Sequence, residues 1–249
     1  ASLDTSPNGC HCGWGGNPEL KPNHETSYDA SLEYYFGRGG VVSFATYLKQ
    51  PDGFITWIHD TGPNGQGVPV PGYDGLYIVD HPLNAGPGTF QGYEFNAQGF
   101  FDFLPGKWAN FGASANFTFN QIAKIKYCYD YPDCTADGDF NALGNSKYTY
   151  NLALYYDTPK FSARLAYNYR DRYRDCLDAD FNQYSLYVDP TSRLDAAINY
   201  TPIKQLTLSL EATNLLHDNA QRWWGEQRLL PMGIRVQART IQLSARFRY

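Results

Sequence analysis

Nine segments of this chain alternate apolar and polar side chains with a period of two, and this pattern constrains the fold more than any other feature. Successive side chains of a β-strand point to opposite faces of the sheet, so such alternation predicts strands with one apolar and one polar face. The predicted strands lie near residues 27–36, 41–48, 89–103, 111–120, 148–156, 161–170, 193–200, 206–213 and 240–249. The predicted fold class is therefore all-β.

The two faces of these strands favour a membrane barrel over a soluble sandwich. The apolar faces carry no charged residue and many aromatic ones, such as Tyr28, Tyr34 and Phe36 in the first strand. The opposite faces hold the charges and are rich in Gly, Ser, Asn and Thr. Alternation alone would also fit a soluble sandwich. A barrel in an outer membrane requires both an aromatic-flanked apolar exterior and a polar lumen.

The connections between the predicted strands alternate strictly between short and long. The short connections are residues 37–40, 104–108, 157–160 and 201–205, and the long ones are residues 49–88, 121–147, 171–192 and 214–239. Outer-membrane barrels have short periplasmic turns and longer extracellular loops, whereas a soluble sandwich has no reason to sort its connections. The sequence therefore predicts a transmembrane antiparallel β-barrel.

Nine strands do not close such a barrel on their own. An open sheet in lipid leaves two edges whose backbone groups lack partners, at several kcal/mol for each group. Single-chain bacterial barrels also have even numbers of strands. We therefore interpret residues 1–249 as the C-terminal part of a larger barrel, with earlier strands supplied by a segment N-terminal to Ala1. One additional strand would instead allow a small closed barrel.

Charge and residue spacing disfavour several other classes of protein. The net charge is −5 and no basic patch is present, which argues against a nucleic-acid partner. His59 precedes Asp60 and His217 precedes Asp218, but neighbours in a strand point to opposite faces and cannot work as a pair. We predict that the chain is not an enzyme and that it needs no cofactor.

The cysteines lie in loop-like segments rather than in the alternating ones. There are five, an odd number, and cysteines in such loops suit an oxidising compartment. Cys128 and Cys134 bracket the sequence YDYPD and could close a short disulfide loop. The acidic segment around them lacks the spacing of a calcium-binding loop, and Cys10-His11-Cys12 is an isolated cluster, so we predict no metal site.

The long connections hold the candidate solute-binding residues. Aromatic rings stack on sugars, and flanking charged and amide groups bind hydroxyls. The candidates are Trp57, Tyr73, Tyr77, Arg222, Trp223, Trp224, Glu226 and Arg228. The alternative, that these aromatic side chains only pack the loops against one another, stays open.

The polar faces of the later strands carry a second set of candidates. These are Arg164, Arg170, Arg193, Asp195, Glu211, Arg246 and Arg248. We expect them to face the lumen and to form ion pairs across neighbouring strands, for example between Asp195 and Arg164 or Arg170.

Three motifs resemble a known family. GNPELKPNHETSYDASLEYYF (16–36), HPLNAGPGTFQGYEFNAQGFFDFLPG (81–106) and LEATNLLHDN (210–219) are similar to stretches of TonB-dependent outer-membrane receptors. The second motif looks like the proteobacterial subgroup often linked with carbohydrate uptake. The resemblance covers essentially the whole chain, in the family's order, up to the aromatic residue Tyr249.

The resemblance implies a location, partners and a function. In this family 22 strands surround an N-terminal plug, and a short box before the plug engages TonB. The protein would then lie in the outer membrane of a Gram-negative bacterium, contacting lipid, with the lumen charges facing the plug. It would reach the TonB system through the missing N-terminal part. The implied function is energised uptake of a scarce small solute, with an oligosaccharide favoured over a siderophore or metal complex. A passive porin-like channel and a secreted β-rich binding domain are the alternatives.

Overall fold

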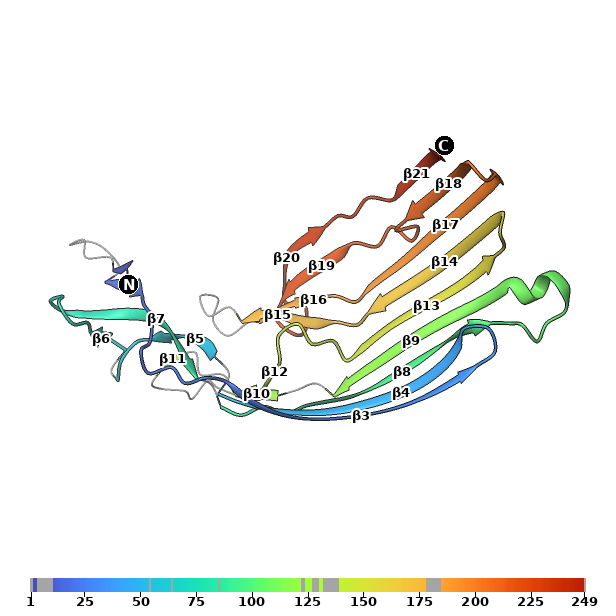
Figure 1. Ribbon diagram of the computed structural model, residues 1–249. Coiled ribbons are helices and arrows are strands. Elements are labelled where there is room, and N and C mark those ends of the chain that lie inside the picture. Colours follow the sequence, from blue (N-terminus) through green and yellow to red (C-terminus); the bar gives the residue numbers. More distant parts are fainter. Residues whose placement is uncertain are drawn as a thin grey trace.

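The computed structural model describes most of the chain. The described residues are 2–3, 11–53, 55–63, 65–84, 86–121, 124–126, 130–131, 139–177 and 185–248. Figure 1 shows that they form one large sheet, bent into an open trough, with smaller sheets at one of its ends.

The large sheet has nine strands within the described residues. They are β3 (His24–Phe36), β4 (Gly40–Asp52), β8 (Phe90–Phe100), β9 (Phe111–Gln121), β13 (Tyr148–Asp157), β14 (Phe161–Arg170), β17 (Thr191–Ile203), β18 (Leu206–Thr213) and β21 (Thr240–Phe247). Every neighbouring pair is antiparallel, and the spatial order follows the chain from β3 to β21. The predicted fold class is confirmed.

Strand β8 is shorter than its alternation predicts, because the residues after Phe100 belong to a turn. There Asp102 Oδ2 accepts a hydrogen bond from the backbone N–H of Arg38 at 2.9 Å. This bond ties the turn after β8 to the turn after β3. The same connection also contains a short 3-10 helix, η1 (Gly106–Asn110), that alternation did not predict.

Apolar side chains gather on one face of the large sheet and remain exposed there. Leu32 in β3 is 75% exposed and Leu243 in β21 is 79% exposed. Cross-strand pairing puts Leu32 opposite Phe44, Phe44 opposite Phe95 and Phe95 opposite Phe117, so the apolar face is continuous. Such a face is the lipid-facing surface of a transmembrane sheet.

Aromatic rings contact one another near both ends of this face. Tyr93, Phe119 and Tyr148 lie toward the long connections, with ring centroids 6.2 and 5.4 Å apart. Toward the short turns, Trp108, Phe111, Tyr156 and Phe161 are linked by centroid distances of 5.6, 4.7 and 6.1 Å. Two aromatic girdles of this kind mark the two water interfaces of an outer-membrane barrel.

The long connections, together with the segment before β3, form smaller sheets of their own. One contains β1 (Ser2–Leu3), β2 (Cys12–Trp14), β5 (Ile55–Asp60), β6 (Val68–Pro69), β7 (Leu76–Asn84) and β11 (Asp130–Tyr131). A second pairs β10 (Lys124–Lys126) with β12 (Asp139–Asn141). A third contains β15 (Tyr173–Leu177), β16 (Ser185–Val188), β19 (Ala220–Trp224) and β20 (Leu230–Arg235). All lie at the end opposite the short turns (Figure 1).

Apart from Pro51 at the end of β4, the buried apolar side chains lie in these connections rather than in the large sheet. Among the described residues they are Ile58, Tyr77, Ala142, Leu186 and Val188. The long connections therefore have packed cores, while the large sheet presents its apolar side chains outward.

The large sheet is not closed, since β3 and β21 are its two edges. In the part of the chain that the structure describes, no helix has the length and apolar character needed to cross a membrane.

Candidate functional site

Two consecutive long connections are joined into a single small sheet. β15 and β16 come from the connection between β14 and β17, and β19 and β20 from the one between β18 and β21. β16 pairs with β19 in antiparallel register, with Tyr187 opposite Trp223 and Leu186 opposite Trp224. The candidates between Arg222 and Arg228 therefore lie on or beside a strand, and not in an irregular loop.

Asp189 organises this small sheet. Its Oδ2 accepts a hydrogen bond from Trp223 Nε1 at 2.9 Å, and its Oδ1 lies 3.1 Å from Arg228 Nη2 and 3.9 Å from Arg172 Nε. The Asp189 side chain is only 12% exposed, so these contacts are poorly screened by water. The sequence analysis did not identify Asp189, because it is a single acidic residue in a long connection that shows no alternation of apolar and polar residues.

The other candidates in this region also have structural contacts. Arg222 Nη2 lies 3.4 Å from Asp175 Oδ2, and the half-buried Trp224 pairs with Leu230 of β20. Glu226 is exposed, and its backbone carbonyl accepts a hydrogen bond from Arg172 Nη1. These residues hold the two connections together, and a role for them in solute binding stays a prediction.

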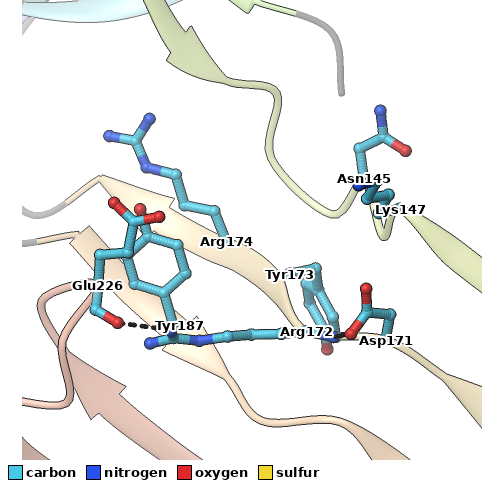
Figure 2. Close-up of a pocket in the computed structure, with 8 residues that line it drawn as sticks. All are labelled: Asn145, Lys147, Asp171, Arg172, Tyr173, Arg174, Tyr187 and Glu226. Carbon is cyan, nitrogen blue, oxygen red and sulfur yellow. Dashed lines mark hydrogen bonds between the residues drawn. The ribbon is translucent and has the colours of Figure 1, made fainter. Parts of the chain in front are cut away.

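A cavity of about 160 Å³ opens beside this sheet (Figure 2). Three cationic side chains reach it, from Lys147, Arg172 and Arg174, against the two carboxylates of Asp171 and Glu226. Its lining is completed by Asn145, Tyr173 and Tyr187. The excess of positive charge suits an anionic group.

Arginine and tyrosine side chains shape this cavity. The guanidinium of Arg172 lies 4.5 Å from the centre of the Tyr187 ring, and Arg174 is only 2% exposed. Burial has the largest effect on the pKa of Tyr187, and the nearby carboxylate of Glu226 acts in the same direction. Together they raise this pKa above its ordinary value of 10.0, although Arg174 and Arg172 lower it. Tyr187 therefore stays an uncharged hydroxyl at physiological pH. None of Lys147, Arg172, Arg174 and Tyr187 was identified from the sequence.

The candidates of the first long connection lie in a different sheet. Trp57 is 57% exposed on β5, whereas Tyr77 is buried on β7, and its ring contacts that of Tyr73 at 6.1 Å. Trp57 pairs with Pro82 of β7. Pro82 is five residues from Tyr77 on the same strand, so the two positions are about 17 Å apart at the rise of a β-strand. The structure therefore brings Tyr73 to Tyr77 but leaves Trp57 apart from both.

The histidines of this sheet pair across strands and not along the sequence. His59 Nδ1 lies 2.7 Å from Asp80 Oδ1, and His81 Nε2 lies 3.2 Å from Asp60 Oδ2. His59 and Asp60 do not pair with each other, as expected for neighbours in a strand. Within the described ranges, no three His, Cys, Asp or Glu side chains gather into a group that could hold a metal ion.

A second cavity, of about 370 Å³, lies on the polar face of the large sheet, at the ends of β13, β14 and β17 that adjoin long connections. It is lined by Thr149, Asn151, Asn168, Tyr169, Arg170, Thr191, Arg193, Asp195, Asp218 and Gln237. Two cationic and two anionic side chains balance, and the remaining lining is uncharged. Such a lining suits a neutral solute with many hydrogen-bonding groups.

The charged side chains around this cavity form hydrogen bonds with the long connections and not the predicted ion pairs. Arg170 donates to the backbone carbonyl of Gly144 at 2.6 Å and to Ser146 Oγ at 2.9 Å. Asp195 Oδ1 accepts a hydrogen bond from the backbone N–H of Asn214 at 2.8 Å. The predicted pairing of Asp195 with Arg164 or Arg170 is therefore wrong among the described residues. Groups of the long connections bind Arg170 and Asp195 instead, and Arg164 lies in register with Ala197 rather than with Asp195.

The remaining lumen candidates share the polar face. Arg193 Nη2 donates to Gln237 Oε1. Arg164 of β14 and Glu211 of β18 lie on either side of the same residue, Ala197 of β17. Their side chains are therefore two strands apart on the polar face. Arg246 pairs with Thr207 of β18, and the backbone N–H of Arg248 bonds to Gln205. Their contact with a plug stays a prediction.

Asn214 secures the start and the end of the last long connection. Its Nδ2 donates to the carbonyls of Asp218 at 3.2 Å and of Gln237 at 3.0 Å, and its Oδ1 accepts from the N–H of Asp218 at 2.9 Å. Asp218 Oδ2 in turn accepts from the N–H of Ser192 at 2.7 Å. The NLLHD motif is thus a structural clamp that joins β17, β18 and the segment before β21.

Cys128 and Cys134 lie outside the described residues. Cys12, at the start of β2, takes part in a disulfide.

Comparisons with known proteins support the architecture. The family model described as TonB dependent receptor-like, beta-barrel, matches residues 4–215. None of the curated proteins compared with the chain matches it. Several solved structures share the fold at low sequence identity, and the chain spans about a third of the length of each of three that we describe.

The three structures are those of an iron transporter and of two receptors for ferric compounds. The FrpB iron transporter of Neisseria meningitidis gives a TM-score of 0.59 at 13% identity, with 95% of this chain and 32% of that chain covered. The ferric enterobactin receptor PfeA of Pseudomonas aeruginosa gives 0.61 at 15%, with 96% and 34% covered. The ferric yersiniabactin uptake receptor FyuA of Yersinia pestis gives 0.58 at 14%, with 90% and 30% covered.

The family match covers most of the chain, and the solved structures share its fold. The lipid-facing apolar surface and the two aromatic girdles agree with a location in the outer membrane of Gram-negative bacteria. The chain is part of the β-barrel of a TonB-dependent receptor.

Proposed function

We propose that the complete protein imports a scarce, bulky solute across the outer membrane with energy supplied through TonB, and that the solute is a carbohydrate. In this proposal an N-terminal plug fills the lumen, contacts Arg164, Glu211 and Arg246, and engages TonB. The long connections face outward and capture the solute. The protein catalyses no reaction.

The observation that most supports a carbohydrate is the cavity of about 370 Å³ at the outer end of the polar face. Its balanced charges give no net attraction for an ion. The amides of Asn151 and Asn168 each offer two donors and an acceptor, and Thr149 and Thr191 add hydroxyls. Sugars present hydroxyl groups that both donate and accept, so they match this lining.

An anionic metal chelate is the second candidate, because the cavity of about 160 Å³ carries more positive than negative side chains. Two of the structures that share the fold are named as receptors for ferric chelates, which is a property of those proteins. The smaller cavity lies among the outward-facing connections and the larger one at the strand ends that adjoin them, so they could also serve two parts of one solute.

Uptake by cells that express the complete protein tests the proposal. Radiolabelled glucose-, xylose- and mannose-based oligosaccharides and ferric siderophores would be offered to cells with and without TonB. We expect oligosaccharide uptake that requires TonB. Equal uptake without TonB would indicate a passive channel, and uptake of ferric chelates alone would favour the second candidate.

A further inference from the structure

Four asparagines stand side by side on the polar face of the large sheet. Asn96 of β8 pairs with Asn116 of β9, Asn116 with Asn151 of β13, and Asn151 with Asn168 of β14. Directly paired residues lie on the same face, with neighbouring strands about 4.8 Å apart, so the four amides span roughly 14 Å. We call these four residues the asparagine row.

The row continues in both directions with polar residues. Asn168 pairs with Arg193 of β17 on one side, and Asn96 pairs with Ser43 of β4 on the other. The row therefore crosses six neighbouring strands without an apolar interruption.

The asparagine row descends from the outer end of the sheet toward its inner end. Asn168 lies two residues from the end of β14 that leads into a long connection. Ser43 lies three residues from the end of β4 that follows a short turn. Because the row runs perpendicular to strands that are tilted in the membrane, it crosses the lumen wall from the mouth almost to the periplasmic side.

The amides of the row are available for binding. None of the four side chains has a hydrogen-bond partner among the residues that the structure describes, although each amide can donate two bonds and accept others. The pleat next to the row holds the short side chains of Ser114, Ala153 and Ala166, which are in register with one another. These short side chains leave the amides accessible from the lumen.

The row is continuous with the larger cavity, since Asn151 and Asn168 belong to both. We propose that the asparagine row is a path along which a neutral, hydroxyl-rich solute passes from that cavity through the barrel. This inference rests on the proposed function and adds a route to it. The uncharged amides exchange hydrogen bonds with successive hydroxyls, so the solute moves without a single strong binding site.

The experiment separates passage from capture. Asn96→Ala and Asn116→Ala would be combined in the complete receptor, because neither residue lines the cavity. Binding of the labelled oligosaccharide panel would be measured on cells depleted of energy, and initial uptake on energised cells. We expect unchanged affinity and uptake about tenfold slower, from the loss of two hydrogen-bonding positions. The double Gln variant, which keeps both amides, should recover much of the rate.

Gln242→Ala is the matched control. Gln242 carries an amide on the same polar face, opposite Glu211, but lies on β21, away from the row. It should leave both binding and uptake at the wild-type level.

Three outcomes overturn the inference. Unchanged uptake in the double Ala variant removes the path and leaves the proposed function intact. Slower uptake accompanied by new sensitivity to vancomycin means that the row docks the plug instead, since a displaced plug opens the lumen. A wild-type protein that takes up no oligosaccharide contradicts both the path and the proposed function.

Discussion

Trp223 donates a hydrogen bond from Nε1 to Asp189 Oδ2 at 2.9 Å, and these two residues, 34 positions apart in the sequence, join two long connections. The indole is therefore part of the loop architecture. Arg228, in the turn between β19 and β20, binds the same carboxylate. Asp189 thus links the end of β16 to β19 and to the turn before β20.

Asp189→Ala should loosen this sheet. Removal of a mostly buried acceptor leaves the indole N–H and the Arg228 guanidinium without their partner, at a cost of about 1–3 kcal/mol. Hydrogen exchange should show amides of β16 and β19 opening at least tenfold faster. Asp175→Ala is the control, because its pair with Arg222 is more exposed and contributes less than about 1 kcal/mol. Equal exchange in the two variants would contradict the central place of Asp189.

Asn214→Ala should release the last extracellular connection. Asn214 is buried, has a φ of +55° and makes three side-chain hydrogen bonds, so the variant loses these bonds and gains backbone strain. We expect a local destabilisation of about 3 kcal/mol. Limited proteolysis between β18 and β21 would measure it. His217→Ala provides the comparison, since His217 has the same φ but is exposed, and it should remain resistant.

Lys147→Glu should separate the two candidate solutes. Lys147 lines the smaller, cationic cavity and is exposed, so reversal of its charge alters the field there with little effect on the fold. An anionic chelate should bind at least tenfold more weakly, and a neutral oligosaccharide with the same affinity. Equilibrium binding to the purified complete receptor gives both values. Gln242→Ala, at a residue that lines neither cavity, should change neither affinity.

Leu165→Arg should destabilise the barrel far more than Ala166→Arg. The two residues are neighbours in β14, and alternation turns Leu165 to lipid and Ala166 to the lumen. An arginine on the lipid face near the midplane costs about 2–4 kcal/mol. Denaturant unfolding of the complete receptor in vesicles would measure the difference. Equal stabilities would mean that the two faces are not distinguished by lipid.

The nine membrane strands could be predicted from the sequence because one physical requirement acts on every second residue. Contact with lipid requires an apolar side chain at positions such as Leu32, Leu165 and Leu243, whichever strand lies beside them. The alternation can therefore be read within each strand alone. The end of β8 was misjudged because Asp102 bonds to Arg38 in another turn, and nothing in the residues after Phe100 signals that contact.

The sites were less predictable because they depend on contacts between distant connections. β16 is only four residues long, and its partner β19 lies beyond two intervening membrane strands. Aromatic and charged residues such as Trp223 and Arg228 stand out in the sequence, whereas their partner Asp189 does not. The asparagine row is likewise a product of strand register, since each strand contributes a single asparagine that is unremarkable by itself.

The central claim is that the Tyr- and Leu-rich face of the sheet meets lipid while the other face meets an aqueous lumen or a plug. Spin labels at Leu152→Cys and Ala153→Cys, neighbours in β13, test it most directly in the complete receptor with its native cysteines blocked. The account predicts that the label at 152 collides mainly with oxygen dissolved in the bilayer, and that the label at 153 is shielded from it. Equal oxygen accessibility at the two positions, or a higher value at 153, would contradict the account.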